Sequence, residues 1–392
     1  MPRNHEESKE VSYGLTRYLS PISVWALAFG CSVGWGAFVM PGTTFLPGAG
    51  PFGTVLGIAL GTVVMLFIGM NYHYLMNRYP DAGGTLTYTA RAFGYDHGFL
   101  SSWFLVLVYV AIIWANATAL TLIARYLLGN TFQFGFHYEI LGYDVYFGET
   151  LLTIAAILLF GCICIAGKKL AGGIQTVMAV ILLGGILISF FAVMGEHEGG
   201  LLTFEPAYAP GGGNAIGQVL GIIILAPWAF VGFESVSHST EEFTFPVKKT
   251  MRLMAAALVT GALSYIMLSE VACAILPEEY DNWASYTREL GSLGGLKGLP
   301  VFYAVGRALG TGGLIILGIT VLAAIITGLI GNYTAASRLL YAMSREGILP
   351  EWFGVRTQEG TPKNALLFLM AVSVGIPFLG RTAIGWIVDV TT

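Results

Sequence analysis

Three glycines fall close together inside the first long apolar stretch of the chain, at Gly30, Gly34 and Gly36. A helix in lipid needs roughly 20 uninterrupted apolar residues, because lipid offers no partner for free backbone N–H and C=O groups. Each glycine lowers helix propensity by about 1 kcal/mol, so we expect the helix to break here. Such a break exposes N–H groups of one half-helix and C=O groups of the other, which together can hold a small charged molecule.

A second interruption lies in the sixth apolar stretch, at Pro227 and Gly232. Proline removes a backbone donor and clashes with the preceding turn, and glycine loosens the helix further. Interrupted helices at equivalent places in two halves of a chain indicate a transporter built from inverted repeats. The two interruptions are therefore predicted to form one binding site. The alternative is that the glycines only allow tight helix packing.

The elements that carry the two interruptions are those of an integral membrane protein. The chain is 55% hydrophobic and 11% charged, whereas soluble domains are about 25% charged. Apolar runs occupy residues 21–47, 51–76, 99–127, 150–167, 170–194, 215–240, 251–276, 301–341 and 364–380. A tenth run begins near Thr382 and is incomplete at Thr392. We therefore expect a longer protein, and poor uptake by residues 1–392 alone.

We predict an all-α integral membrane fold of about ten spans, with inverted five-helix repeats and discontinuous first and sixth helices. The predicted divisions are a cytoplasmic N-terminal tail at residues 1–20, a first five-helix repeat at 21–194, an extracellular loop at 195–213, and a second repeat at 214–392 that is truncated in the tenth helix.

Basic residues gather on one side of the predicted spans. Most of the 19 Lys and Arg residues lie on the side of the N-terminus. Apart from Arg125 and Arg307 near helix ends, the opposite side carries Arg288, Lys297 and Arg381. Because cytoplasmic loops hold the excess of Lys and Arg, we predict a multi-pass protein of the cell membrane with its N-terminus in the cytoplasm.

Several classes of chemistry have no signal in the sequence. It holds no nucleophile–base constellation, no G-x-G-x-x-G or phosphate-binding loop, and no zinc-ligand spacing. The net charge of −4 is too small to argue for a nucleic acid partner. We therefore predict that the protein is not an enzyme and has no catalytic residues, no cofactor and no metal site.

Four motifs, in order along the chain, resemble those of the amino acid–polyamine–organocation superfamily of permeases. Residues 34–38 read G-W-G-A-F and resemble its first-helix G-x-G-I-F element, with Ala37 where Ile is usual. Residues 79–94 resemble the signature that follows its second helix. Residues 230–246 resemble its sixth-helix F-x-G-F-E block, and residues 336–350 resemble the stretch after its eighth helix.

This resemblance implies the fold of the bacterial leucine transporter and a role for both interruptions. It implies that the substrate carboxylate is held by backbone N–H groups around Gly34, Trp35 and Gly36, beside Ala37. A half-helix N-terminus carries about half a positive charge, and glycine lets the backbone approach a ligand closely. It also implies that the substrate amino group is held by backbone carbonyls at the two breaks. These are the carbonyl of Val33 at the first break and those of Trp228, Ala229 and Val231, beside Gly232, at the second.

The resemblance assigns further roles to single side chains. Trp228 aligns with an aromatic gate over the substrate, the alternative being an ordinary core tryptophan, and Phe230 is assigned to gating with it. Glu234 is the acidic residue nearest the middle of a span, and we favour gating or structure over proton carriage. Asn116 takes the place of a third-helix Asn that reaches the substrate in arginine–agmatine exchangers. Interhelical hydrogen bonding is the alternative role for Asn116.

The means of energy coupling stays open among exchange, proton and sodium coupling. Some related permeases place a Lys midway along the fifth helix, where Leu182 falls in this chain, so coupling of that type is disfavoured. Sodium would need hydroxyls from the eighth span, for which Thr320 and Thr327 are candidates. A co-transported proton or sodium ion is therefore a possible partner beside the lipid bilayer.

The leading hypothesis is a secondary active transporter that moves amino acids by alternating access. One alternative is a permease for polyamines or other organic cations, which would lack a carboxylate for the amides at the first break and would need acidic residues in the cavity. Another is a permease-like amino-acid sensor domain of a longer protein. The side-chain specificity and the oligomeric state cannot be read from the sequence.

Overall fold

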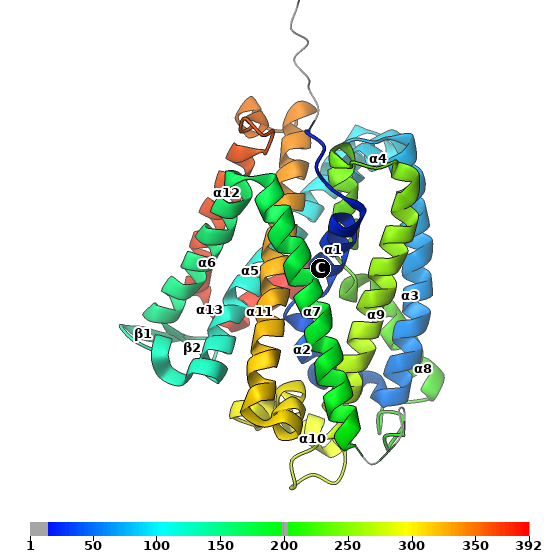
Figure 1. Ribbon diagram of the computed structural model, residues 1–392, viewed down its shortest axis with the longest axis vertical. Helices are drawn as coiled ribbons and strands as arrows, with labels where there is room; N and C mark the ends of the chain where they lie inside the picture. Colours follow the sequence, from blue (N-terminus) through cyan, green and yellow to red (C-terminus); the bar gives the residue numbers. More distant parts are fainter. Residues whose placement is uncertain (1–14, 198, 200–202, 392) are drawn as a thin grey trace, which may run out of the picture.

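The computed structural model describes residues 15–197, 199 and 203–391, and the described chain is mostly helical (Figure 1). Its elements, in chain order, are α1 (Pro21–Ser32), α2 (Gly36–Met40), η1 (Pro41–Phe45), α3 (Leu46–Arg78), α4 (Thr85–Phe93), α5 (Tyr95–Leu128), η2 (Gly129–Phe132), β1 (His137–Ile140), β2 (Tyr143–Tyr146), α6 (Phe147–Ala166), α7 (Lys168–Glu196), α8 (Ala215–Ala229), η3 (Phe233–Glu242), η4 (Val247–Lys249), α9 (Thr250–Ala274), α10 (Trp283–Glu289), η5 (Leu290–Ser292), η6 (Gly295–Gly298), α11 (Pro300–Arg345), η7 (Glu351–Gly354), α12 (Lys363–Val374), η8 (Ile376–Leu379) and α13 (Gly380–Thr391). Most of the predicted tail at 1–20 and part of the predicted loop at 195–213 lie outside the described residues.

Eight segments of the described chain are long and apolar enough to cross a membrane. They are Gly36–Arg78, Tyr95–Phe132, Phe147–Ala166, Lys168–Glu196, Ala215–Glu242, Val247–Ala274, Pro300–Arg345 and Lys363–Ile387. The shorter apolar helix α1 precedes them. The helical membrane architecture is therefore as predicted. Two of these segments, Gly36–Arg78 and Lys363–Ile387, each join parts of two predicted runs across a glycine with positive φ, Gly50 and Gly380 respectively.

The first of these segments is α2, η1 and α3. The single π-helical turn η1 carries α2 directly into α3, and the helical backbone then breaks at the predicted boundary between the runs at residues 21–47 and 51–76. The change of direction takes place at Gly50, whose φ is +67°. A Cβ atom there would lie 2.6 Å from the Cα of Tyr208, so the two backbones meet closely at this bend.

The long helix α11 is also divided. A straight helix of its 46 residues would be roughly 69 Å long at 1.5 Å per residue, more than twice the ~30 Å apolar core of a bilayer. Gly310, with φ +59° and ψ −148°, breaks the helical backbone. The segment before Gly310 is therefore a separate short helix at one end of the bundle.

A small hairpin departs from the all-helical expectation. Strands β1 and β2 pair antiparallel, with Ile140 opposite Tyr143. The two residues between them, Leu141 and Gly142, have φ of +52° and +75°, as a tight two-residue hairpin turn requires. Both strands contact α13.

The middle of the bundle is formed by α1, α5 and α11. Helix α11 packs against α5 and α7, and α1 packs against α7, α9 and α11. In Figure 1, α4 lies at one end of the bundle and α10 at the other, and we call these the α4 end and the α10 end. Both interrupted helices, α1–α2 and α8–η3, run between these two ends.

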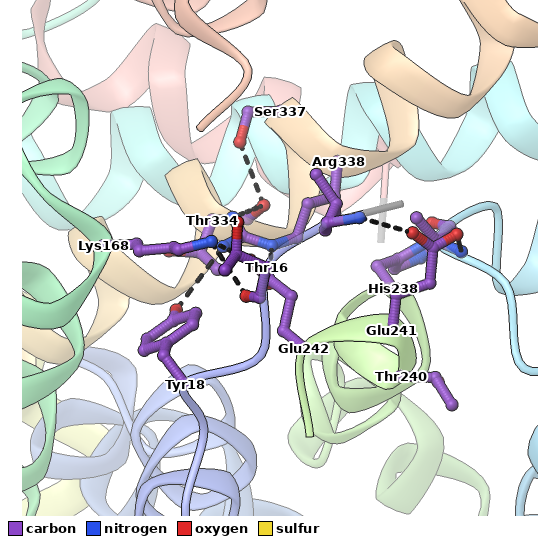
Figure 2. Close-up of polar contacts among 12 residues, drawn as sticks. Thr16, Tyr18, Lys168, His238, Thr240, Glu241, Glu242, Thr334, Ser337 and Arg338 are labelled. Carbon is purple, nitrogen blue, oxygen red and sulfur yellow. Dashed lines mark hydrogen bonds and ion pairs between the residues drawn. The ribbon is translucent and has the colours of Figure 1, made fainter. Parts of the chain in front are cut away.

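A buried ion network lies at the α4 end (Figure 2). Glu242, at the end of η3, is fully buried and accepts a 2.5 Å hydrogen bond from Nε of Arg338. The Nζ of Lys168 lies 3.8 Å from the other carboxylate oxygen. Both cations are also nearly inaccessible to solvent, so one carboxylate compensates two positive charges from α7 and α11.

The N-terminal segment is tied into the same network. The N–H groups of Tyr18 and Leu19 donate to the carbonyl of Glu242, at 2.8 and 2.9 Å, and Nζ of Lys168 donates to the carbonyl of Thr16. Burial, and then the nearby Glu242 carboxylate, raise the pKa of the Tyr18 phenol well above its ordinary value. Tyr18 therefore stays neutral and accepts a hydrogen bond from Arg338.

A second carboxylate links the neighbouring segments at this end. Glu241 accepts hydrogen bonds from the N–H of Leu15 at 2.9 Å and from the N–H of Ala82 at 3.2 Å. Its carboxylate also lies 3.2 Å from the guanidinium of Arg345. The N-terminal segment, η3, the loop before α4 and the end of α11 are thus held together by charge and hydrogen bonds.

Replacing Glu242 with Gln should destabilise the protein strongly. The substitution leaves Arg338 and Lys168 buried without an anion, and removing one partner of a buried ion pair costs about 3–5 kcal/mol. The free energy of unfolding, measured by titration with a denaturing detergent in mixed micelles, should fall by that amount. The matched control is Glu351→Gln on the exposed turn η7, which should change it by less than about 0.5 kcal/mol. Equal stability of the two variants would contradict this role for Glu242.

Candidate binding site

The first interruption separates α1 from α2 at residues 33–35. The backbone leaves the helical region at Val33, with φ −107° and ψ +85°. The N–H of Val33 still donates to the carbonyl of Phe29 at 2.9 Å, which ends α1. Within the described part of the chain, the N–H groups of Gly34 and Gly36 have no hydrogen-bond acceptor. Two backbone donors at the start of α2 are therefore available to a ligand.

Asn116, near the middle of α5, faces this interruption. Its Oδ1 lies 3.4 Å from the N–H of Trp35, and its Nδ2 donates to the carbonyl of Ile112 at 3.0 Å. A Cβ atom at Gly34 would lie 2.9 Å from the same Oδ1, so the amide can approach only because this residue is glycine. The side chain of Asn116 thus fixes the orientation of the first break.

The second interruption separates α8 from η3. Helix α8 ends at Ala229, and Gly232 adopts the left-handed conformation with φ +104°. The carboxylate of Glu234 accepts a 2.8 Å hydrogen bond from the N–H of Gly232, and its other oxygen accepts one of 3.0 Å from the hydroxyl of Tyr109. Both oxygens of this buried carboxylate are therefore used in holding the break.

The two interruptions touch one another. A Cβ atom at Gly232 would lie 2.8 Å from the Cβ of Cys31 and 2.9 Å from its carbonyl oxygen. The hydroxyl of Ser32 lies 3.2 Å from the carbonyl of Phe230. The hydroxyl of Tyr265, on α9, lies within hydrogen-bonding distance of the last carbonyls of both half-helices, Ser32 at 3.1 Å and Ala229 at 2.8 Å. One side chain thus joins the ends of α1 and α8.

A cavity of about 330 Å³ opens at this junction, a volume typical of small-molecule sites. Among its lining residues are eight that we predicted, namely Gly34, Trp35, Gly36, Ala37, Asn116, Trp228, Ala229 and Val231. Four others do not line it and lie buried behind the junction, namely Val33, Phe230, Gly232 and Glu234. The structure therefore brings both interrupted segments and α5 to one hollow.

Several lining residues could not be found from the sequence. Tyr265 is one of 19 tyrosines and sits in an ordinary apolar run. Arg381, which we expected in an outside segment, lines the cavity from α13 together with Ile384 and Gly385. The residues of α13 that face the cavity are set by the point where η8 ends and α13 begins. No local sequence pattern predicts that point.

The residues considered for ion coupling do not line this cavity, although Thr327 lies against Gly30 of α1. The hydroxyls of Thr320 and Thr327 donate to carbonyls of their own helix α11, at 2.7 and 2.9 Å. Leu182 is fully buried on α7. Two side chains of α7 reach α1: Nε2 of Gln175 donates to the carbonyl of Ala26 at 3.3 Å, and the hydroxyl of Thr176 lies 3.4 Å from that of Ser23. Among the described residues, no group of three His, Cys, Asp or Glu side chains could hold a metal ion.

The chain resembles known transport proteins in sequence. A family model described as amino acid permease matches residues 24–390. The chain is 25% identical over 364 residues to the branched-chain amino acid permease BcaP of Lactococcus lactis subsp. cremoris (strain MG1363), covering 90% of this chain and 73% of the relative. It is also 25% identical over 349 residues to the low-affinity putrescine importer PlaP of Escherichia coli (strain K12), covering 86% and 71%.

The fold is shared with a solved transporter structure. A Na⁺-coupled sialic acid symporter, in a substrate-bound outward-open state, superposes with a TM-score of 0.55 at 13% sequence identity. The match covers 95% of this chain and 75% of the symporter. The resemblance to the permease superfamily and to the leucine-transporter-type fold, predicted from the motifs, is thus confirmed.

Replacing Gly232 with Ala should disturb the junction of the two interruptions. The left-handed backbone costs about 1–3 kcal/mol for a residue with a side chain, and the added methyl group would also meet Cys31. The midpoint of thermal unfolding in detergent should fall accordingly. Gly221 lies on the same segment, in α8, where an added methyl group meets open space. Gly221→Ala should be neutral or stabilising by up to about 1 kcal/mol, and equal midpoints for the two variants would contradict the account.

Proposed function

Because the chain belongs to the amino acid permease family, we propose that this multi-pass membrane protein is a secondary active transporter that moves amino acids by alternating access. The observation that carries the proposal is the pair of interrupted helices that meet at one cavity. Free N–H groups of one half-helix and carbonyl groups of another face a hollow large enough for a small zwitterion. Coupling is by exchange or by an ion.

The carboxylate of the substrate binds at the start of α2. The N–H groups of Gly34 and Gly36 are available there, and the N–H of Trp35 can leave the long hydrogen bond to Asn116 for a stronger acceptor. An anion at a helix N-terminus gains from the aligned peptide dipoles as well as from direct hydrogen bonds. Hydrogen bonds from N–H groups to a charged acceptor are roughly twice as strong as neutral ones.

The amino group of the substrate binds to carbonyls where α1 and α8 end. The carbonyls of Trp228, Ala229 and Val231, which line the cavity, belong to residues with incomplete helical hydrogen bonding, because the helix stops there. Val33, which was expected to contribute a carbonyl as well, lies behind the cavity wall. Tyr265 contacts the carbonyl of Ala229, and a carbonyl oxygen has a second lone pair for an ammonium group. Trp228 lies beside these carbonyls in the cavity wall, where it serves as an aromatic gate.

Glu234 and Phe230 act in gating rather than in substrate contact. Both lie behind the cavity wall, and the two carboxylate oxygens of Glu234 hold Gly232 and Tyr109. A carboxylate with these partners supports a role as a lock on the second break. Movement of η3 relative to α5 would break the hydrogen bond to Tyr109, which couples the break to the packing of the bundle.

We also propose the orientation and the repeat organisation that the sequence indicates. The inverted repeats are residues 21–194 and 214–392, and the N-terminus is cytoplasmic. In that orientation the network of Glu241 and Glu242 closes the cytoplasmic entrance of the cavity. Because this closure consists of ion pairs and hydrogen bonds between separate segments, it can open without breaking any helix.

A permease for polyamines is the second candidate, favoured by the similarity to the putrescine importer PlaP. A polyamine carries positive charge at both ends and no carboxylate, so its cavity needs acidic side chains. None of the described lining residues of this cavity is acidic, and one is an arginine. The cavity therefore favours an amino acid over a polyamine.

The function is tested by binding to the purified full-length protein in detergent. Each common amino acid, and putrescine as the cationic alternative, is added and the midpoint of thermal unfolding is measured. A ligand at 100 times its dissociation constant stabilises the folded state by about 2.7 kcal/mol, and uptake of the stabilising ligand into proteoliposomes then shows transport. Stabilisation by amino acids is expected. Stabilisation by putrescine alone would overturn the proposal.

Replacing Asn116 with Ala should weaken binding of that amino acid at least tenfold, or about 1.4 kcal/mol. The substitution removes the side chain that orients Trp35 and Gly34 at the carboxylate site. Titration of the unfolding midpoint against ligand concentration gives the affinity. Asn71→Ala, at an exposed position of α3 whose amide only contacts its own helix, is the matched control and should bind like the unmodified protein. Unchanged affinity of the Asn116 variant would exclude it from the site.

A further inference from the structure

An arginine lines the proposed substrate cavity. Arg381 lies in the first turn of α13, and Ile384 and Gly385 line the cavity beside it. Residues three and four positions apart share one face of a helix, so α13 turns the Arg381 face toward the hollow. Arg381 is thus part of the cavity wall and not of an outer loop.

The contacts of Arg381 use only part of its hydrogen-bonding capacity. One terminal nitrogen donates to the carbonyl of Ala115 at 2.5 Å and to the hydroxyl of Thr118 at 2.7 Å, both on α5. A guanidinium has five N–H donors in a fork that matches a carboxylate. Among the described residues, no acceptor contacts Nε or the other terminal nitrogen, and no carboxylate lies within 4 Å.

Three other cations of this bundle have an acidic partner. Arg338 and Lys168 share Glu242, and Arg125 pairs with Glu149 at 2.5 Å. Glu149 is the carboxylate that shares a small neighbouring hollow with Arg381, but Arg125 occupies both of its oxygens. Arg381 is therefore a cation whose contacts in the described chain are all neutral.

A positive charge without an anion is costly at membrane depth, and such residues mark substrate pathways. The missing partner can be supplied by the cargo. A carboxylate in the cavity would accept two parallel hydrogen bonds from the free side of the guanidinium, the strongest form of this interaction. A cationic side chain in the same place would meet uncompensated like charge.

Arg381 and the first interruption lie around neighbouring residues of α5. Ala115 accepts the hydrogen bond from Arg381, and the next residue, Asn116, faces Trp35 and Gly34. Consecutive Cα atoms are about 3.8 Å apart. The guanidinium and the free N–H groups at the start of α2 are thus two anion-binding positions of one cavity.

We propose that the substrate is an acidic amino acid, with its α-carboxylate at the Gly34 and Gly36 N–H groups and its side-chain carboxylate on Arg381. This inference rests on the proposed function and adds the substrate class to it. Arg381 is then the residue that selects an anionic side chain. The cavity discriminates against neutral amino acids of the same size and strongly against cationic ones.

The test compares isosteric pairs on the purified full-length protein. Affinities for glutamate and glutamine, and for aspartate and asparagine, are measured by titration of the thermal unfolding midpoint. We expect at least one acid to bind ten times or more tightly than its amide. Amides that bind as tightly as both acids would overturn this inference while leaving amino-acid transport intact. Binding of no amino acid at all would overturn the proposed function instead.

Substitution of the arginine then locates the selectivity. Arg381→Gln should lower affinity for the preferred acid at least tenfold and leave affinity for the corresponding amide within threefold. Arg381→Lys, which keeps the charge, should restore part of the preference for the acid. Arg307→Gln, at a largely exposed arginine of α11, is the control and should keep the full preference. Equal loss of acid and amide binding in both Arg381 variants would assign Arg381 to the α-carboxylate or to folding and would contradict the proposal.

Discussion

The whole structure depends on one constraint, which is that backbone N–H and C=O groups at membrane depth must find a partner. Two helices are interrupted there, and the bundle meets the cost locally. Gly232 lets the second break lie directly against Cys31 in the first, and the hydroxyl of Tyr265 reaches the last carbonyl of each half-helix. What these contacts leave over, chiefly the N–H groups of Gly34 and Gly36, faces the cavity. The binding site thus consists of the few backbone groups that remain without a hydrogen-bond partner where the two interrupted helices meet.

The bundle has two kinds of contact in two places: close backbone packing at the junction of the breaks, and ion pairs between separate segments at the α4 end. Around the junction, glycine positions bring backbones into direct contact, so small changes of geometry are resisted. At the α4 end, by contrast, the segments are joined through Glu241 and Glu242 to arginine and lysine side chains from other elements. Buried ion pairs contribute little net stability relative to apolar packing, although removing only one partner of such a pair lowers the free energy of unfolding strongly. Such contacts fit the proposed role of this end as an entrance that closes completely and opens as a unit.

The sequence predicted what depends on local chemistry. Glycine and proline within apolar runs predicted both interruptions, and four motifs predicted the family. Eight of the proposed site residues line one cavity, while Val33, Phe230, Gly232 and Glu234 lie behind it. The lining residues include four in a row, 34–37, so no simple periodicity of the sequence separates them from those behind the wall. Tyr265 and Arg381 were missed since their roles arise from the packing of α9 and α13. The hairpin of β1 and β2 and the continuous turn η1 were missed too, because each depends on one or two residues with unusual backbone angles.

The backbone of the first interruption is the proposed anchor for the substrate, whatever side chain the cavity selects. It follows that the α-carboxylate must be ionised and unmodified for binding. The most direct test is to measure, on the purified full-length protein, the affinity of the amino acid that stabilises it most and of the same compound as its α-amide. The account predicts that the α-amide binds at least tenfold more weakly. Equal affinities would show that the N–H groups of Gly34 and Gly36 do not hold the carboxylate, and would contradict the central claim.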